Sequence, residues 1–201
     1  LNEMNRTNRN PNMVVGEWYA ENADGLKGWV DAVTSGLNSE TRSAVPVKVF
    51  DFSLRRALKD ALDNGGNARQ VFFNSLKDAK GMSGFNIMTF LNNHDFRSSN
   101  PSFGDALVHN NPILGYAYLL TNNQLGVPTV FYPDYYGYPS RNSTFGTDTY
   151  GFDYHPTGLS PMKAEIDQLI KVLQRYINNS PGVDYLNHYG GTGNGPSAPN
   201  N

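Results

Sequence analysis

Cysteine is absent from the 201 residues of this chain. Its absence excludes disulfide bonds, thiolate metal ligands and thiol redox chemistry, but it leaves the compartment open, because secreted and cytosolic proteins can both do without cysteine. Long apolar runs are missing as well, since no stretch approaches the roughly 20 residues that span a bilayer. The first residues do not form the basic segment and apolar core of a signal peptide. We therefore expect no membrane-spanning segment, no signal peptide and no membrane partner for this chain.

An excess of charge of one sign is also missing. The chain carries 16 Lys and Arg residues against 18 Asp and Glu residues, and these charges are spread without long runs. Such a balance gives no electrostatic footprint for nucleic acid or for an anionic membrane. A neutral or small substrate fits this composition better.

Four apolar stretches with strand character alternate with helical patterns, in which apolar residues recur three and four positions apart. The expected strands cover residues 13–17, 46–52, 86–92 and 127–132, and the expected helices cover residues 23–33, 54–62, 112–120 and 161–176. We expect a Ser/Asn/Thr-rich loop after the first of these helices, and a long Gly/Tyr/Asn-rich loop over residues 134–158. This alternation is typical of a parallel α/β sheet.

Two folds share this alternation. Four strand-helix units make half of a (β/α)₈ barrel, whereas an open doubly wound sheet would carry a phosphate-binding glycine fingerprint, which is missing after every strand. The half-barrel is therefore favoured, over residues 1–187, with a flexible Gly/Pro/Asn-rich tail over residues 188–201. Residues 1–6 read like the last turns of a helix, so we expect that the chain begins in mid-domain.

Acidic residues stand at the ends of two expected strands. The first strand passes through Gly16 into Glu17, which is followed by Trp18 and Tyr19, and the third strand ends in Asn93-His94-Asp95. Barrel enzymes keep their catalytic groups at the carboxyl ends of the strands. A Glu at a strand end can also merely cap a helix, and Asn/His/Asp clusters often satisfy loop backbone. We expect Asp51, at the end of the second strand, to be structural.

Four motifs in order carry a family resemblance. They are Val15-Gly16-Glu17, Phe50-Asp51-Phe52-Ser53-Leu54, Phe90-Leu91-Asn92-Asn93-His94-Asp95 and Gly126-Val127-Pro128-Thr129-Val130-Phe131-Tyr132. Together they resemble the C-terminal half of the catalytic TIM barrel of α-amylase-type glycoside hydrolases, from the fifth strand to the eighth helix. The resemblance implies retaining hydrolysis of α-glucosidic bonds in starch-like α-glucans.

The resemblance also implies roles for single residues. Glu17 and Asp95 would be the catalytic residues. Glu17 would be the general acid and base, and Asp95 would bind ring hydroxyls and distort the sugar toward the transition state, while His94 would bind a hydroxyl of the same ring. Trp18 and the apolar strand could desolvate Glu17 and keep it protonated. Besides these, the predicted substrate-binding residues are Asn93, Tyr19, Tyr135 and Tyr136, of which the tyrosines could stack on sugar faces.

One part of the family's machinery has no counterpart in this sequence. The motif with the nucleophilic Asp would precede Leu1, so the chain alone should be inactive, and its partner would be the missing N-terminal half of the barrel. The open sheet edges of a half-barrel should also favour self-association. No metal site is expected, because His94 shows no ligand spacing with His109, His155 or His188. No cofactor is required; the resemblance makes calcium possible, with ligands mostly outside this chain.

Other functions remain open at this stage. A non-catalytic carbohydrate-binding or scaffold half-barrel would keep the same motifs, and an α-glucan transglycosylase would use the same residues with a sugar in place of water as acceptor. A secreted or extracellular location is favoured by the resemblance alone.

Overall fold

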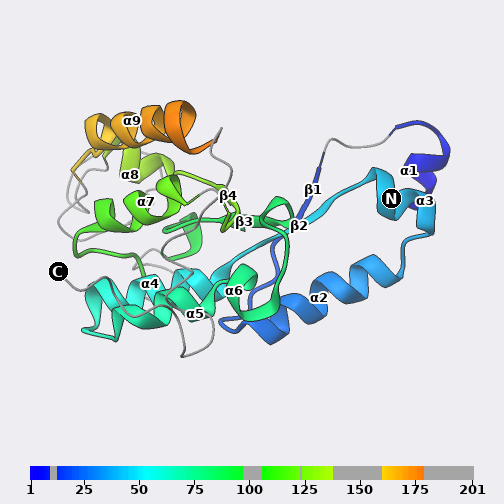
Figure 1. The fold of residues 1–201 in the computed structure, drawn as a ribbon, viewed down its shortest axis with the longest axis horizontal. Helices are drawn as coiled ribbons and strands as arrows, with labels where there is room; N and C mark the ends of the chain where they lie inside the picture. Colours follow the sequence, from blue (N-terminus) through cyan, green and yellow to red (C-terminus); the bar gives the residue numbers. More distant parts are fainter. Residues whose placement is uncertain (10–12, 97–105, 123, 138–159, 179–201) are drawn as a thin grey trace, which may run out of the picture.

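The computed structural model describes residues 1–9, 13–96, 106–122, 124–137 and 160–178. The helices are α1 (Asn2–Arg6), α2 (Ala23–Ser35), α3 (Ser39–Ala44), α4 (Phe52–Asp63), α5 (Val71–Asn74), α6 (Leu76–Lys80), α7 (Pro112–Thr121), α8 (Tyr132–Tyr136) and α9 (Lys163–Val172). Short 3₁₀ turns are η1 (Ala68–Gln70), η2 (Gly84–Asn86) and η3 (His94–Phe96), and the π-helical turn η4 (Leu173–Ile177) continues α9. Figure 1 shows an elongated arrangement, with α7, α8 and α9 gathered at one end and the N-terminal helices α1 and α3 at the other.

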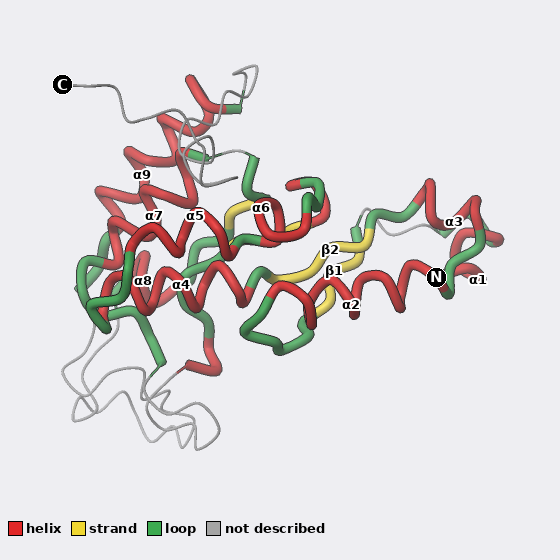
Figure 2. The backbone as a smooth tube through the Cα atoms, turned by 60° about the horizontal axis from the view of Figure 1, so that its bottom comes forward, coloured by secondary structure: helices red, strands yellow, loops and turns green. Residues whose placement is uncertain are grey.

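The described strands form one parallel sheet in the order β1 (Val14–Gly16), β2 (Val47–Phe50), β3 (Ile87–Thr89) and β4 (Val127–Pro128). Val14 pairs with Val47, Val49 with Ile87, and Met88 with Val127. The strands β1 and β2 lie side by side, and their amino ends face the end of the molecule that carries α1 and α3 (Figure 2). The predicted α/β class with a parallel sheet is thus confirmed, although each strand is shorter than predicted.

Local sequence explains where the main helices begin and end. Asn22 caps α2 by accepting a hydrogen bond of 2.8 Å from the Gly25 amide. Asp51 caps α4 in the same way, and α4 stops at Asn64, after which Gly65 takes a φ of +65° that few other residues tolerate. These capping residues hold the helices in the places that apolar periodicity predicts.

Short elements depart from the sequence-based prediction. The loop expected after α2 contains the helix α3, which Asn38 caps through a hydrogen bond from the Thr41 amide. The strand expected over residues 127–132 ends at Pro128, and Tyr132 begins α8 with a Pro in its first turn. Both helices were missed because a helix of five or six residues is too short to show helical periodicity in the sequence. Most of the loop 134–158 and the tail 188–201 lie outside the described residues.

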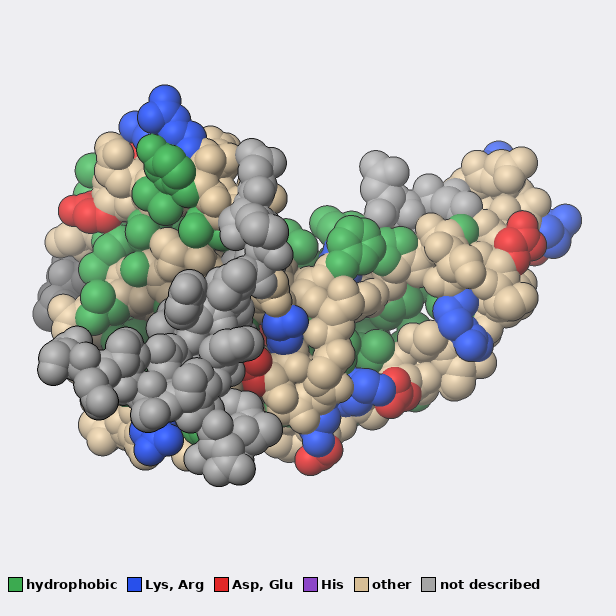
Figure 3. All heavy atoms as spheres, viewed as in Figure 1, with side chains coloured by type: hydrophobic (Ala, Val, Ile, Leu, Met, Phe, Trp, Pro, Cys, Tyr) green, Lys and Arg blue, Asp and Glu red, His purple; other side chains and the backbone are tan. Residues whose placement is uncertain are grey.

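Apolar side chains pack in two clusters. The first joins α2 and α6 to the sheet around Leu26, Val49 and Ile87. The second joins α4, α7 and α9 around Leu58, Leu119 and Ile166. Apolar side chains also appear at the surface near α7 and α9 (Figure 3). The exposed large apolar residues of α7, α8 and η4 are Leu114, Tyr132, Tyr136 and Tyr176. No described helix has both the length and the apolar character needed to cross a membrane.

Candidate active site

A small cavity lies where the carboxyl ends of the strands meet. Because the four strands are parallel, the residues that follow them share one edge of the sheet. The cavity has a volume of about 210 Å³. It is lined by Glu17, Phe50, Phe90, Asn92, Asn93, His94, Thr129, Val130 and Phe131. Three of the residues predicted from the sequence, Glu17, Asn93 and His94, are therefore brought together from two strand ends.

The approach of β1 to this cavity depends on a glycine. A Cβ atom added to Gly16 would lie 1.8 Å from the ring of Trp29 on α2, so any other residue here would force the indole to move. The Trp29 indole therefore packs directly against the backbone of β1, one residue before Glu17. This contact fixes the strand end from which Glu17 projects.

The surroundings of Glu17 differ from those predicted. Its side chain is exposed, and Trp18 is 49% exposed, so Trp18 does not cover the carboxyl. The desolvation expected from Trp18 is therefore absent in the described part of the structure. Both residues follow the end of β1 at Gly16, and both side chains are exposed. The Glu17 carboxyl is open to the cavity and to solvent.

His94 and Asp95 lie in the short turn η3, directly after β3. The Asp95 amide donates a hydrogen bond of 3.0 Å to the Asn93 Oδ1 atom, which orders the start of this turn. The His94 Nε2 atom lies 3.6 Å from the Asp95 Oδ1 atom. Asp95 is half-buried and does not line the cavity, whereas His94 does. The rings of Phe50 and Phe90 line the same cavity. The Glu17 carboxyl and the His94 imidazole can each transfer a proton, and together with the Asn93 amide they can bind hydroxyl groups.

Asn92 is a cavity residue that sequence reasoning missed. Its side chain is only 4% exposed, its Nδ2 atom donates to Asp134 Oδ2 at 2.9 Å, and its Oδ1 atom accepts from the Val108 amide at 2.8 Å. Tyr116 also donates to Asp134 Oδ2, at 2.5 Å. A polar Asn directly after a buried strand, beside the more conspicuous Asn93, was the available signal.

Burial dominates the electrostatics of these hidden groups. It raises the pKa of Asp134 to about 6, although the hydrogen bonds from Tyr116 and Asn92 oppose the rise. Burial and the neighbouring Asp134 carboxylate together raise the pKa of Tyr116 well above its ordinary value. The tyrosine therefore remains a hydrogen-bond donor over the whole physiological range.

The predicted tyrosines lie outside the lining of this cavity. Tyr19 donates a hydrogen bond of 2.7 Å to Glu21 and packs edge-on against Phe52, and burial with the Glu21 contact raises its pKa to about 12. Tyr135 bonds to Asp167 on α9 at 2.6 Å. The Tyr136 ring is 54% exposed and lies on the rings of Tyr132 and Tyr135. Their stacking role, like that of Trp18, stays a prediction.

Asp51 is structural, as predicted. It is fully buried, and its two carboxylate oxygens accept the amides of Leu54 in α4 and Leu76 in α6, at 2.9 and 2.8 Å. One side chain thus ties the first turns of two helices to the end of β2. Burial raises the pKa of Asp51 to about 7, and the backbone hydrogen bonds oppose that rise.

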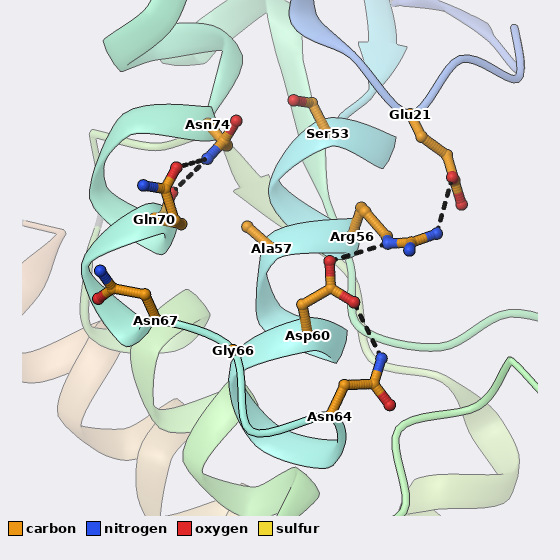
Figure 4. Close-up of a pocket in the computed structure, with 10 residues that line it drawn as sticks. All are labelled: Glu21, Ser53, Arg56, Ala57, Asp60, Asn64, Gly66, Asn67, Gln70 and Asn74. Carbon is orange, nitrogen blue, oxygen red and sulfur yellow. Dashed lines mark hydrogen bonds and ion pairs between the residues drawn. The ribbon is translucent and has the colours of Figure 1, made fainter.

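A larger hollow of about 460 Å³ lies elsewhere, along α4 and the segment that leads into α5 (Figure 4). Its charged groups contact one another: Arg56 bonds to both Glu21 and Asp60 at 2.9 Å, and Asn64 donates to Asp60 at 2.9 Å. The site residues predicted from the sequence do not line it. We therefore place the candidate site in the smaller cavity.

The described residues do not fit a metal centre. They contain no group of three or more His, Asp or Glu side chains that could hold a metal ion. The calcium that the family resemblance makes possible would therefore find no such group of ligands among these residues. His155 and His188 lie outside the described residues.

Comparisons with known proteins give three relatives. No family model matches the chain. It is 30% identical over 143 residues to a glucan 1,4-alpha-maltohexaosidase of Bacillus sp. (strain 707), which is 70% of this chain and 23% of that protein. It is 27% identical over 170 residues to the cytoplasmic alpha-amylase of Escherichia coli (strain K12), with 84% of this chain and 30% of the relative covered.

The third relative is an alpha-amylase of Geobacillus stearothermophilus, 27% identical over 191 residues, which covers 94% of this chain and 29% of the relative. The chain thus spans less than a third of the length of the curated relatives it matches. The preference for a secreted location stays a prediction, because one relative is named as cytoplasmic.

Proposed function

We propose that this chain, which is related to α-amylases, is the acid- and base-bearing part of a retaining α-glucan hydrolase. The observation that carries the proposal is the meeting of Glu17 with Asn93 and His94 around one cavity at the carboxyl end of the parallel sheet. The names of the relatives supply the substrate class. The resemblance of the four motifs supplies the roles of the single residues.

In this proposal Glu17 moves the proton. Its carboxyl group donates a proton to the glycosidic oxygen as the bond breaks, and the resulting carboxylate later accepts a proton from the attacking water. His94 and Asp95 bind hydroxyls of the reacting sugar and hold it while positive charge develops on the ring. A bound sugar would cover the Glu17 carboxyl, which is open to solvent in the structure.

A retaining reaction also needs a second carboxylate, about 5–5.5 Å from the first. The family's nucleophile motif has no match in this sequence. We propose that this carboxylate comes from strands that complete a (β/α)₈ barrel, of which β1 to β4 form one half. Those strands would pair with β1 and β4, the edges of the described sheet, where Met13 and Val127 are exposed.

The test compares two glutamates in a protein that joins this chain to the nucleophile-bearing half of an α-amylase barrel. Glu17→Gln should lower the hydrolysis of soluble starch by about 10²–10⁴-fold while maltoheptaose still binds, because an amide cannot donate the proton. Glu21→Gln is the matched control, since Glu21 bonds to Arg56 beside the larger hollow, and it should leave the rate unchanged.

Three results would count against the proposal or refine it. Equal rates for the Glu17 variant and the parent would show that Glu17 is not the acid. Binding of maltoheptaose without any hydrolysis by the parent would favour the non-catalytic carbohydrate-binding alternative. Production of longer glucans from maltoheptaose would favour a transglycosylase.

A further inference from the structure

A buried polar network lies directly behind the candidate site. Asp134 is 2% exposed, and its Oδ2 atom accepts two hydrogen bonds, from Asn92 Nδ2 at 2.9 Å and from the Tyr116 hydroxyl at 2.5 Å. The Tyr116 oxygen in turn accepts the Phe131 amide at 3.2 Å. The Asn92 Oδ1 atom accepts the Val108 amide at 2.8 Å. Both ends of the Asn92 amide are therefore engaged.

This network joins segments that are far apart in the chain. Asn92 follows β3, Tyr116 belongs to α7, Phe131 follows β4, and Asp134 belongs to α8. Asn92 and Phe131 both line the cavity that contains Glu17. The network thus sets the end of β3 against the end of β4 at the point where the predicted site residues begin.

The geometry of such a network is fixed by its burial. A buried donor or acceptor that loses its partner keeps the full cost of leaving water, so alternative arrangements of these side chains are disfavoured. Asn93, His94 and Asp95 follow Asn92 without an intervening residue. Their orientation must therefore depend on how the Asn92 side chain is held.

The turn is also held from its other side. Arg55 on α4 donates to the Leu91 carbonyl at 3.1 Å, and its guanidinium lies 3.8 Å from the centre of the Phe96 ring. Leu91 and Phe96 flank the segment from Asn92 to Asp95. Arg55 therefore supports the two ends of the turn, while the network acts on its first residue.

We propose that Asn92, Tyr116 and Asp134 are positioning residues, which hold the turn η3 so that His94 lines the Glu17 cavity. This role rests on the proposed function, because it assigns a purpose to the orientation of a glucan-binding turn. The three residues do not donate or accept the proton in the reaction.

The test is a substitution that reverses the donor and the acceptor. In the full chain, Asn92→Asp places a carboxylate oxygen where Nδ2 faced Asp134, and the two carboxylates repel each other. The double variant Asn92→Asp with Asp134→Asn restores a donor and acceptor pair between positions 92 and 134, but the Tyr116 hydroxyl loses its acceptor, because it donates to the same Asp134 Oδ2 atom. Asn86→Asp is the matched control, because the Asn86 Nδ2 atom donates to the Val47 carbonyl at 3.0 Å at the opposite end of β3.

The readout is hydrogen exchange of the Asp95 amide together with the nuclear magnetic resonance signals of the His94 imidazole. Asn92→Asp should raise the exchange of the Asp95 amide by about tenfold or more and shift the His94 signals, because one buried hydrogen bond to a charged group is lost. The double variant should restore both signals in part, because the pair between positions 92 and 134 is rebuilt while the Tyr116 hydroxyl lacks its acceptor. Asn86→Asp should lower stability without changing either signal.

Two results would overturn the proposal: unchanged Asp95 and His94 signals in Asn92→Asp, or no recovery in the double variant. If Asn92→Asp does not fold, Tyr116→Phe carries the test, with Tyr118→Phe on the same helix as its control. In that series, unchanged signals in Tyr116→Phe would overturn the proposal.

Calorimetry with maltoheptaose separates this inference from the proposed function. If the variants show the expected signal changes but the parent chain does not bind maltoheptaose, the result supports the positioning network and counts against glucan binding. A parent chain that binds maltoheptaose, with variants that leave the turn unchanged, refutes the network and leaves the proposed function standing.

Discussion

The two cavities of this protein differ in what their polar side chains already contact. In the larger hollow on α4, the Arg56 guanidinium lies between the carboxylates of Glu21 and Asp60. In the smaller cavity, Glu17 forms no hydrogen bond or ion pair with any described residue. A charge that neighbouring side chains neutralise has less capacity left for a ligand. The difference teaches that the partners of the polar side chains mark a binding site better than the volume of the cavity does.

The smaller cavity is also bordered by a cluster of packed phenylalanine rings. The Phe90 ring packs against Phe50, Phe52 and Phe96, with ring centres 5.0–6.3 Å apart. The larger hollow is bordered by exposed polar residues at the end of α4 and before α5. We therefore expect changes behind the smaller cavity to affect the whole fold, and changes at the larger hollow to stay local.

The largest expected effect on stability comes from truncating the Phe90 ring of that cluster. Phe90→Ala should lower the free energy of unfolding by about 3–5 kcal/mol, because a buried aromatic side chain is replaced by a cavity. Gln70→Ala at the larger hollow should change it by less than about 0.5 kcal/mol. Urea denaturation measures both values. Equal losses in the two variants would remove the distinction between the two regions.

The second effect is a pH dependence with opposite signs in the two regions. Burial raises the pKa of Asp134 to about 6 from an ordinary value of 3.8, so the protonated form is favoured in the folded state. The stability that this group contributes is present below pH about 4 and is lost as the pH rises through about 6, by up to about 3 kcal/mol. Asp134→Asn should flatten the unfolding free energy over this interval.

Asp60 provides the contrast. Burial would raise its pKa, but the hydrogen bonds from Arg56 and Asn64 outweigh burial and lower it. The stability that Asp60 contributes is present at neutral pH and is lost as the pH falls through its lowered pKa. Asp60→Asn should therefore change the unfolding free energy only at acidic pH. Asp51 also has a raised pKa, but it is present in both variants and cancels in their comparison. Identical pH profiles for the two variants, from thermal unfolding at each pH, would contradict this prediction.

The third effect concerns the binding of sugar. His94→Ala should weaken the binding of maltoheptaose by about tenfold, which corresponds to the loss of one hydrogen bond to a bound hydroxyl. Asn74→Ala, at the rim of the larger hollow, should leave binding unchanged. Titration calorimetry distinguishes the two outcomes. A larger loss of maltoheptaose affinity in Asn74→Ala than in His94→Ala would show that the glucan binds at the larger hollow.

The smallest effect is expected at Arg56. Its side chain is 48% exposed and makes two ion pairs, to Glu21 and to Asp60, both at 2.9 Å. Exposed ion pairs are screened by solvent, so Arg56→Met should lower the free energy of unfolding by less than about 1 kcal/mol and leave maltoheptaose binding intact. A loss of several kcal/mol in urea denaturation would show that this hollow is a structural centre.

Much of the fold could be predicted from the sequence, because its signals are local. The alternation of apolar strands with amphipathic helices predicts β1 to β4 and the helices α2, α4, α7 and α9, and the structure confirms them. The helices α3 and α8 were missed, since each covers only a turn or two and depends on a capping residue or on a Pro. The ends of the strands and helices were less well predicted, because they too depend on single capping residues and prolines.

The candidate site was predicted unevenly. Glu17, Asn93 and His94 stand at strand ends, so parallel pairing alone brings them to one edge of the sheet. Tyr135 was predicted near the sugar, but its hydroxyl bonds to Asp167 on α9. Aromatic residues near a strand end carry no signal for the direction in which the next helix turns them.

The sequence by itself determined where the strands and the helices between them lie along the chain, and it determined the acid at the first strand end, because each follows from residues close together in the chain. Tertiary structure alone decided that Asn92 meets Asp134, 42 residues later, and that Trp18 leaves Glu17 uncovered. Such contacts depend on how β3, β4, α7 and α8 pack together. No local pattern of residues records that packing.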